Sequence, residues 1–268
     1  MSGQPAGPIL PATLPLFAAA AFAWLMCALA PRVSVPDALI DPLAVLLAVV
    51  PALFALASAH RYELSVLRSL GVLAFGVLLL TGLFVVGLTR ELCALQVLGL
   101  LSVGRGAGGL IGDRVAHPGH VLPACVVAAT ADVLSVLSPE GVSAAIVKSD
   151  RALSVAALAA PVFGSSAITF VLGAGDLVMM GLVLSVARRF DVARTRVVLA
   201  LALGLTAAFA LSALLERPIP ALVTIGVAVV VLVPRFARVE RRDRSAAVVA
   251  STICAGLVSV ALWRALRG

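Results

Sequence analysis

The sequence predicts an all-α polytopic membrane protein with about nine transmembrane helices. Hydrophobic residues make up 62% of the 268 positions and charged residues only 12%, whereas a soluble domain has about 25% charged residues. The apolar residues are gathered in runs of the length that a membrane-spanning helix needs. These runs also lack the alternation of apolar and polar residues that is typical of barrel strands, and only helices or closed barrels span a bilayer.

Eight of the apolar runs are clear candidates for membrane spans: residues 14–30, 43–59, 70–88, 121–137, 167–187, 197–215, 219–233 and 246–263. Residues 92–103 form a weaker ninth candidate, because Arg105 and a cluster of glycines follow closely. Residues 152–163 are apolar but only about half a membrane thickness long. They are compatible with a short helix, a re-entrant piece or an extended strand at the membrane surface.

Two further segments are interpreted as connections. Residues 103–114, VGRGAGGLIGDR, do not have the spacing of a nucleotide-binding loop, and we expect a flexible cytoplasmic link. His117 and His120 flank a Pro-Gly turn without cysteines or further acids nearby in sequence, which favours a polar turn over a metal site. We expect neither a metal nor a cofactor.

The basic residues indicate orientation in the membrane and not nucleic-acid binding. The net charge is +7, but the arginines lie in short loops between apolar runs. The richest loops, residues 188–196 and 235–244, are predicted to face the cytoplasm together with Arg61, Arg68, Arg105 and Arg114. This places the N-terminus inside and the C-terminus outside. The bias toward Ala, Val, Leu and Arg is typical of a GC-rich bacterial genome and predicts the bacterial inner membrane.

Two acids stand apart from the others. Of thirteen Asp and Glu residues, only Asp132 and Asp176 lie well inside an apolar run, where an ionisable group is costly and is a candidate for function. They occupy consecutive strong spans, so antiparallel neighbouring helices would bring them to similar depth. Two carboxylates that share a site have separated pKa values, and such a pair supplies a general base and a general acid.

The acid pair alone leaves three interpretations open. The first is a hydrolase with the chemistry of aspartic proteases. The second is a transporter or channel in which the acids carry protons or cations. The third is a structural role, in which each acid binds backbone groups or the hydroxyls nearby in sequence.

Three motifs occur in order around these acids. Residues 173–176 read Gly-Ala-Gly-Asp, which matches a GxGD motif, and residues 220–222 read Pro-Ala-Leu, a PAL motif. Asp132 is followed by apolar residues and by Pro139 and Gly141. In this order the motifs resemble the presenilin and signal peptide peptidase family of intramembrane aspartyl proteases. The resemblance covers about residues 121–233.

The resemblance implies a function and a set of residues. The chain would be a presenilin-like bundle that hydrolyses peptide bonds within membrane-spanning segments of proteins or signal peptides. Its substrate would be a helical transmembrane segment in the lipid bilayer that unwinds and pairs as a strand, here with residues 156–163. Neither partner subunits nor a nucleic acid are implied. Asp132 and Asp176 would be the catalytic pair, and the residues shaping the site would be Gly173, Ala174, Gly175, Pro220, Ala221 and Leu222.

The same resemblance suggests how the chain is organised. Residues 1–120 would form a scaffold of helices, residues 121–236 the catalytic helices, and residues 237–268 a basic loop with a last helix. Pro218 and Pro220 would favour the start of a helix. Ala131 stands where the family commonly has Tyr. A transporter or channel, and a presenilin-like membrane protein without catalysis, stay open as alternatives.

Overall fold

The computed structural model describes residues 9–137, 145–146, 148–217 and 219–267. The described chain is mainly helical and contains one two-stranded sheet. It divides into two compact units. Unit 1 comprises Met1–Gly112 and Ser149–Ser185, and unit 2 comprises Asp113–Lys148 and Val186–Gly268.

Six helical segments of the described chain are long and apolar enough to cross a membrane. They correspond to the helices α1 (Ile9–Leu29), α2 (Asp37–Ala59), α3 (Val66–Val86), α4 (Cys93–Gly112), α5 (Val121–Leu137) and α9 (Arg194–Leu215). This is compatible with a multi-pass membrane protein. Three further predicted spans fall on the helices α8 (Ala174–Arg189), α10 (Ala221–Leu232) and α12 (Arg244–Arg267), which are not among the six. The count of nine spans is therefore not confirmed.

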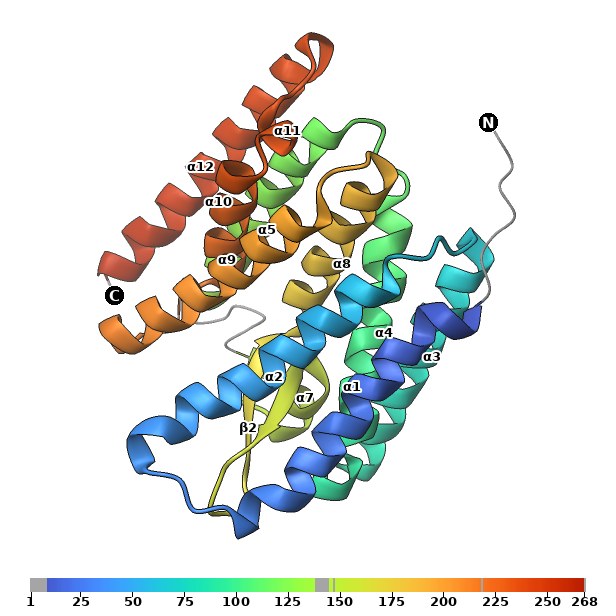
Figure 1. The fold of residues 1–268 in the computed structure, drawn as a ribbon. Coiled ribbons are helices and arrows are strands. Elements are labelled where there is room, and N and C mark those ends of the chain that lie inside the picture. Colours follow the sequence, from blue (N-terminus) through green and yellow to red (C-terminus); the bar gives the residue numbers. More distant parts are fainter. Residues whose placement is uncertain (1–8, 138–144, 147, 218, 268) are drawn as a thin grey trace. The chain divides into compact units, whose positions relative to one another are not determined.

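Helix α4 lies at the centre of unit 1. It contacts α3 along its length and also packs on α1, and Figure 1 shows α3 and α4 side by side. Within its most apolar stretch, 67% of α4 is buried, compared with 22% for α3. The small residues Gly76 on α3 and Gly99 on α4 lie at their contact, where an added Cβ on Gly76 would come within 2.7 Å of the Gly99 carbonyl oxygen.

The prediction of a flexible connection at residues 103–114 was wrong. Helix α4 continues through this stretch to Gly112. Arg105, predicted to lie in a cytoplasmic loop, is fully buried within the helix, where its Nη2 donates a hydrogen bond to the Tyr62 carbonyl oxygen at 2.8 Å. Each glycine in a helix costs about 1 kcal/mol relative to alanine. Close packing against neighbouring elements therefore outweighs the low helix propensity of this glycine-rich stretch.

The glycines of α4 allow a close approach to α8. Gly104, Gly108 and Gly112 recur every fourth residue and therefore lie on one face of α4. A Cβ added to Gly108 would lie 2.6 Å from the Leu182 backbone nitrogen, and one on Gly181 would meet the Gly104 carbonyl oxygen. Small residues at this spacing let helix backbones approach in membranes, where van der Waals packing drives helix association.

The prediction of a single helix at residues 167–187 was also wrong. Its first part is strand β2 (Ile168–Gly173), and the helix α8 begins only at Ala174. The strand sequence ITFVLG is rich in β-branched and aromatic residues, which favour extended backbone. A partner strand, β1 (Ala157–Pro161), supplies the hydrogen bonds that an isolated strand would lack.

The hairpin resolves the alternatives left open for residues 152–163. The short helix α7 (Asp150–Ala156) precedes β1, and the Ser149 hydroxyl caps it by accepting the Ala152 N–H at 3.3 Å. Strand β1 pairs antiparallel with β2, with Ala157 opposite Gly173 and Pro161 opposite Ile168. An irregularity between Leu158 and Ala159 shifts the register. The hairpin thus leads directly into the GxGD motif.

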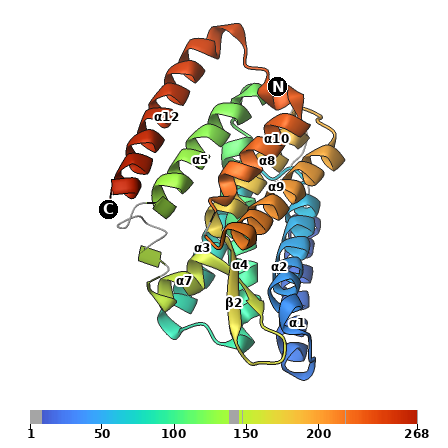
Figure 2. The ribbon, with the colours of Figure 1, turned by 90° about the vertical axis from the view of Figure 1, so that its left-hand side faces the viewer.

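Unit 2 is built from α5, α9, α10, the short helix α11 (Pro234–Ala237) and α12. Helix α10 packs on both α9 and α5, and α12 lies beside α5 (Figure 2). Glycines again mark the close contacts. A Cβ added to Gly204 of α9 would lie 2.6 Å from the Ile225 Cα of α10, and one on Gly226 would lie 3.3 Å from the Cys125 Cβ of α5.

The packing of α4 on α8 predicts the effect of adding one methyl group. Gly108→Ala should destabilise the protein by about 1–3 kcal/mol, because the new Cβ overlaps backbone atoms that cannot move independently. Gly82→Ala on the exposed face of α3 is the matched control, since its Cβ meets nothing within 4 Å. It should be neutral or slightly stabilising. Unfolding of purified protein by heat or by titration with denaturing detergent measures both, and equal stabilities for the two variants would contradict this packing.

Candidate functional site

Asp132 lies on α5 and contacts the start of α10. Its Oδ2 accepts a hydrogen bond from the Leu222 backbone N–H at 3.0 Å. Leu222 is the second residue of α10, and Pro220 precedes the helix as its cap residue. The first N–H groups of a helix have no partner within the helix, and Pro220 has no side chain that can cap them. The Asp132 carboxylate therefore supplies the acceptor that the PAL motif lacks.

Asp176 has an equivalent position at the start of another helix. It lies in the first turn of α8, and its Oδ2 accepts the Gly173 backbone N–H at 3.0 Å. This is half of a capping box, in which an acid in the first turn reaches back to the residue before the helix. The positive end of the helix dipole further favours a carboxylate at this place. The apolar run can therefore hold an acid here.

The structure brings some of the predicted site residues together. Asp132 and the Pro220–Leu222 motif meet within unit 2, although Asp132 and Leu222 are 90 residues apart in sequence. Gly173, Ala174, Gly175 and Asp176 form one turn within unit 1. The two acids belong to different units, and each side chain is half-buried.

The two glycines of the GxGD motif differ in their surroundings. A Cβ added to Gly173 would lie 3.3 Å from Asp176 Oδ2, a tight contact that would disturb the acid. A Cβ on Gly175 would meet nothing within 4 Å, so packing within unit 1 does not require a glycine there. Pro218 and the predicted exit at Pro139 and Gly141 lie outside the described residues.

An apolar groove runs along α5 and α10 beside Asp132. It has a volume of about 310 Å³ and includes Ala129, one helical turn before Asp132, and Val223, the residue after Leu222. The groove belongs entirely to unit 2. The Asp132 carboxylate therefore lies close to one end of an apolar surface.

Gln96, which was not among the residues predicted from the sequence, holds the hairpin next to Asp176. This side chain is fully buried on α4. Its Nε2 donates to the carbonyl oxygens of Ser154 at 2.7 Å and Ala157 at 2.6 Å, and its Oε1 accepts the Ala159 N–H at 3.0 Å. The side-chain amide of Gln96 thus supplies hydrogen-bond partners for the backbone groups of β1 that point away from β2. The signal in the sequence was a single amide within the apolar run 92–103.

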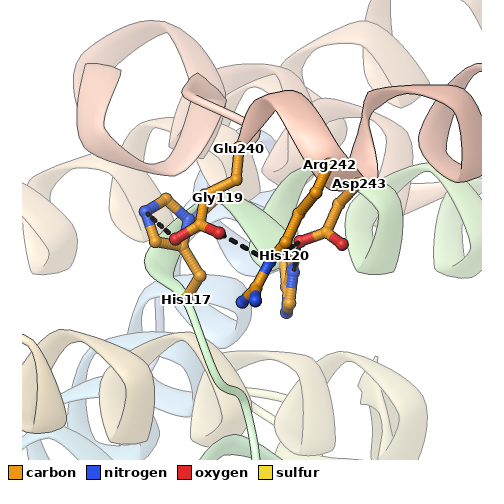
Figure 3. A network of polar contacts seen from close by, with 6 residues as sticks. All are labelled: His117, Gly119, His120, Glu240, Arg242 and Asp243. Atoms are coloured by element: carbon orange, nitrogen blue, oxygen red, sulfur yellow. Dashed lines mark hydrogen bonds and ion pairs between the residues drawn. The ribbon is translucent and has the colours of Figure 1, made fainter.

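A second polar cluster lies in unit 2 (Figure 3). His120 Nε2 lies 2.9 Å from Asp243 Oδ2, and His117 Nε2 lies 3.7 Å from Glu240 Oε1. Arg242 Nε bridges the acids at 2.8 Å from Glu240 and 3.8 Å from Asp243. The polar turn at His117 and His120 therefore binds the segment before α12. In the part of the chain that the structure describes, no three His, Cys, Asp or Glu side chains form a group that could hold a metal ion.

Comparison of the chain with models of known protein families, with curated proteins and with solved structures finds no match.

The contacts of Gln96 predict a large loss of stability on its removal. Gln96→Met keeps the shape of the side chain but leaves two carbonyl oxygens and one N–H without their partner in a buried place. Each such loss costs about 1–3 kcal/mol, so we expect a total of about 3 kcal/mol or more. Hydrogen exchange should show loss of protection at Ala159 before the helices open. Unchanged exchange at Ala159 would contradict this role.

The ion pair of His120 and Asp243 predicts a dependence on acid pH. The hydrogen bond from His120 holds the pKa of the Asp243 carboxyl below its ordinary value of 3.8. Stabilisation by this carboxylate is therefore present above pH 3.8 and is lost as the pH falls through the lowered pKa. Wild type should exceed Asp243→Asn in stability at pH 5, and the gap should narrow only as the pH falls below 3.8. Asp150→Asn on α7 serves as control, and a gap that already narrows between pH 7 and pH 5 would refute the assignment.

Proposed function

We propose that the chain is a presenilin-like intramembrane aspartyl protease. The observation that carries this proposal is the hydrogen bond from Leu222 of the PAL motif to Asp132. Two motifs that are separated in sequence, and that were associated only through a family resemblance, meet at one carboxylate. The turn that contains Gly173 and Asp176 gives separate support, because the glycine and the acid of the GxGD motif are also in direct contact.

The proposed chemistry uses the carboxylates of Asp132 and Asp176 without a metal or a covalent intermediate. One carboxylate, ionised, takes a proton from water as the water oxygen attacks the peptide carbonyl carbon. The other, protonated, donates its proton to the carbonyl oxygen, which gives a tetrahedral intermediate with two hydroxyl groups. As the C–N bond breaks, the first acid gives the proton it took from water to the leaving amine, and the second acid takes a proton back from one hydroxyl as the C=O bond re-forms. The N–H of Leu222 and the N–H of Gly173 each hold one of these carboxylates in place by a hydrogen bond. Each acid then returns to its starting state after one turnover.

The proposed substrate is a membrane-spanning segment that becomes extended near the site. A strand can bind by adding to the edge of a sheet. Residues 156–163 were expected to provide this edge. However, the Gln96 side chain already forms hydrogen bonds with the backbone groups of β1 that point away from β2. We therefore assign the substrate strand to β2, whose residues from Ile168 to Val171 are partly exposed and lead to Asp176.

The bacterial inner membrane is the proposed location, with the arginine-rich loops at 188–196 and 235–244 in the cytoplasm. Nine transmembrane helices in a presenilin-like bundle belong to the same proposal.

A membrane protein without catalysis is the second candidate, and one observation favours it. Each acid accepts an N–H at the start of a helix, a role that stabilises a helix without any chemistry. A transporter or channel has no such support, since it depends on the acids alone.

Substitution by Asn separates catalysis from capping. Asn accepts the same backbone N–H as Asp but cannot act as acid or base. Asp132→Asn and Asp176→Asn should each lower cleavage of a reporter transmembrane substrate by about 10³-fold and leave stability nearly unchanged. Asp132→Ala and Asp176→Ala should also lower stability by about 1 kcal/mol.

The assay uses purified protein in liposomes, with gel analysis of the cleaved reporter. Asp37→Asn, in the first turn of α2, is the matched control and should cleave at the wild-type rate. Cleavage that survives either Asn substitution would refute the paired-acid mechanism. A wild-type protein that cleaves no reporter, with stability lost only in the Ala variants, would favour the second candidate.

A further inference from the structure

Unit 1 contains an open groove that the proposed protease does not use. Helices α1, α3 and α4 line it, and its volume is about 430 Å³. Its surface is formed mainly by apolar side chains, which include Leu16 and Phe17 of α1, Phe75 of α3 and Leu98 of α4. The groove therefore suits an apolar ligand.

One end of this groove carries a positive charge. Among the described residues that line it, Arg68 is the charged one. Arg68 lies in the first turn of α3, after the Ser65 cap whose hydroxyl accepts the Arg68 N–H at 3.4 Å. The helix dipole adds partial positive charge at this end, and guanidinium groups bind phosphate with parallel hydrogen bonds. The groove thus combines an apolar length with an anion-binding end.

The dimensions of the groove fit part of a lipid leaflet. Arg68 and Phe75 both line it on α3, and seven residues of helix span about 10 Å. Half of the hydrocarbon core of a bilayer is about 15 Å thick. Arg68 is predicted to lie at the cytoplasmic end of its span, so the apolar length of the groove runs from that surface toward the middle of the membrane.

A protein helix fits the groove poorly. A helix about 10 Å wide occupies roughly 420 Å³ for each turn of 5.4 Å. The groove would hold a single turn of such a helix, which leaves most of the contact surface of a transmembrane partner outside. A lipid chain is narrow enough to lie along it.

We propose that this groove binds an anionic phospholipid of the cytoplasmic leaflet. The phosphate contacts the Arg68 guanidinium and the start of α3, and one acyl chain lies along the groove past Gly71 and Val72 toward Phe75. The site lies within unit 1 and is independent of Asp132 and Asp176.

Binding is measured by native mass spectrometry of the purified full-length chain in detergent. The probes are dioleoylphosphatidylglycerol and dioleoylphosphatidylcholine, which have the same chains and differ in net charge. Wild type should bind the anionic lipid more tightly. Arg68→Gln should reduce this preference by about fivefold, the contribution of one arginine near an anionic headgroup. Arg61→Gln, an exposed arginine outside the groove lining, is the matched control and should change the preference by less than about twofold.

A second pair of variants tests the position of the acyl chain. Gly71→Leu fills the groove without a clash of its Cβ, because that atom meets nothing within 4 Å, and it should weaken binding of both lipids. Gly82→Leu on the same helix also meets open space and lies outside the groove lining, so lipid binding should be unchanged. Thermal unfolding of all four variants verifies that each is folded.

Three results would overturn the proposal. The first is that Arg68→Gln weakens the binding of both lipids equally. The charge of Arg68 would then not select the anionic lipid. The second is displacement of the lipid by millimolar inorganic phosphate, which indicates an ion site without a lipid chain. The third is unchanged binding in Gly71→Leu, which places the chain elsewhere.

Discussion

The close approach of α4 to α8 is the contact on which unit 1 depends. Gly104, Gly108 and Gly181 bring the two helix backbones so near that no Cβ fits between them. Lipid tails are as apolar as the side chains they surround, so helices in a bilayer associate mainly through such packing and through hydrogen bonds. Because α8 begins at the GxGD motif, this contact also sets where Asp176 lies within unit 1. Helix α4 therefore helps to position the acid within unit 1.

Backbone hydrogen bonding is the second constraint, and it explains the roles of three polar side chains. In an apolar medium each unpaired N–H or carbonyl group is costly. Gln96 satisfies the outer backbone of β1, Asp132 caps α10, and Asp176 caps α8. The proposed catalytic acids thus lie where helices begin inside apolar surroundings. The same N–H groups that need an acceptor also hold the two carboxylates in place.

The sequence predicted helices well wherever an apolar run was long and uniform. The runs 14–30, 43–59 and 70–88 correspond closely to α1, α2 and α3. The predictions failed at residues 103–114 and 167–187, where local composition and tertiary contact disagree. Glycines suggested a flexible link, yet packing against α8 stabilises a helix there. Continuous apolarity suggested a helix at residues 168–173, but a buried helix and a buried strand have the same hydropathy, and pairing with β1 decides between them.

The sequence by itself determined which acids are unusual. Asp132 and Asp176 are recognisable because an ionisable residue deep in an apolar run is costly and therefore rare. Only the tertiary structure showed that Asp132 accepts the Leu222 N–H and that Gln96 holds β1. These partners lie 90 and 63 residues apart along the chain. Hydropathy and periodicity indicate which side of a segment is buried and which is exposed. A long-range hydrogen bond depends instead on which backbone group the fold leaves without a partner.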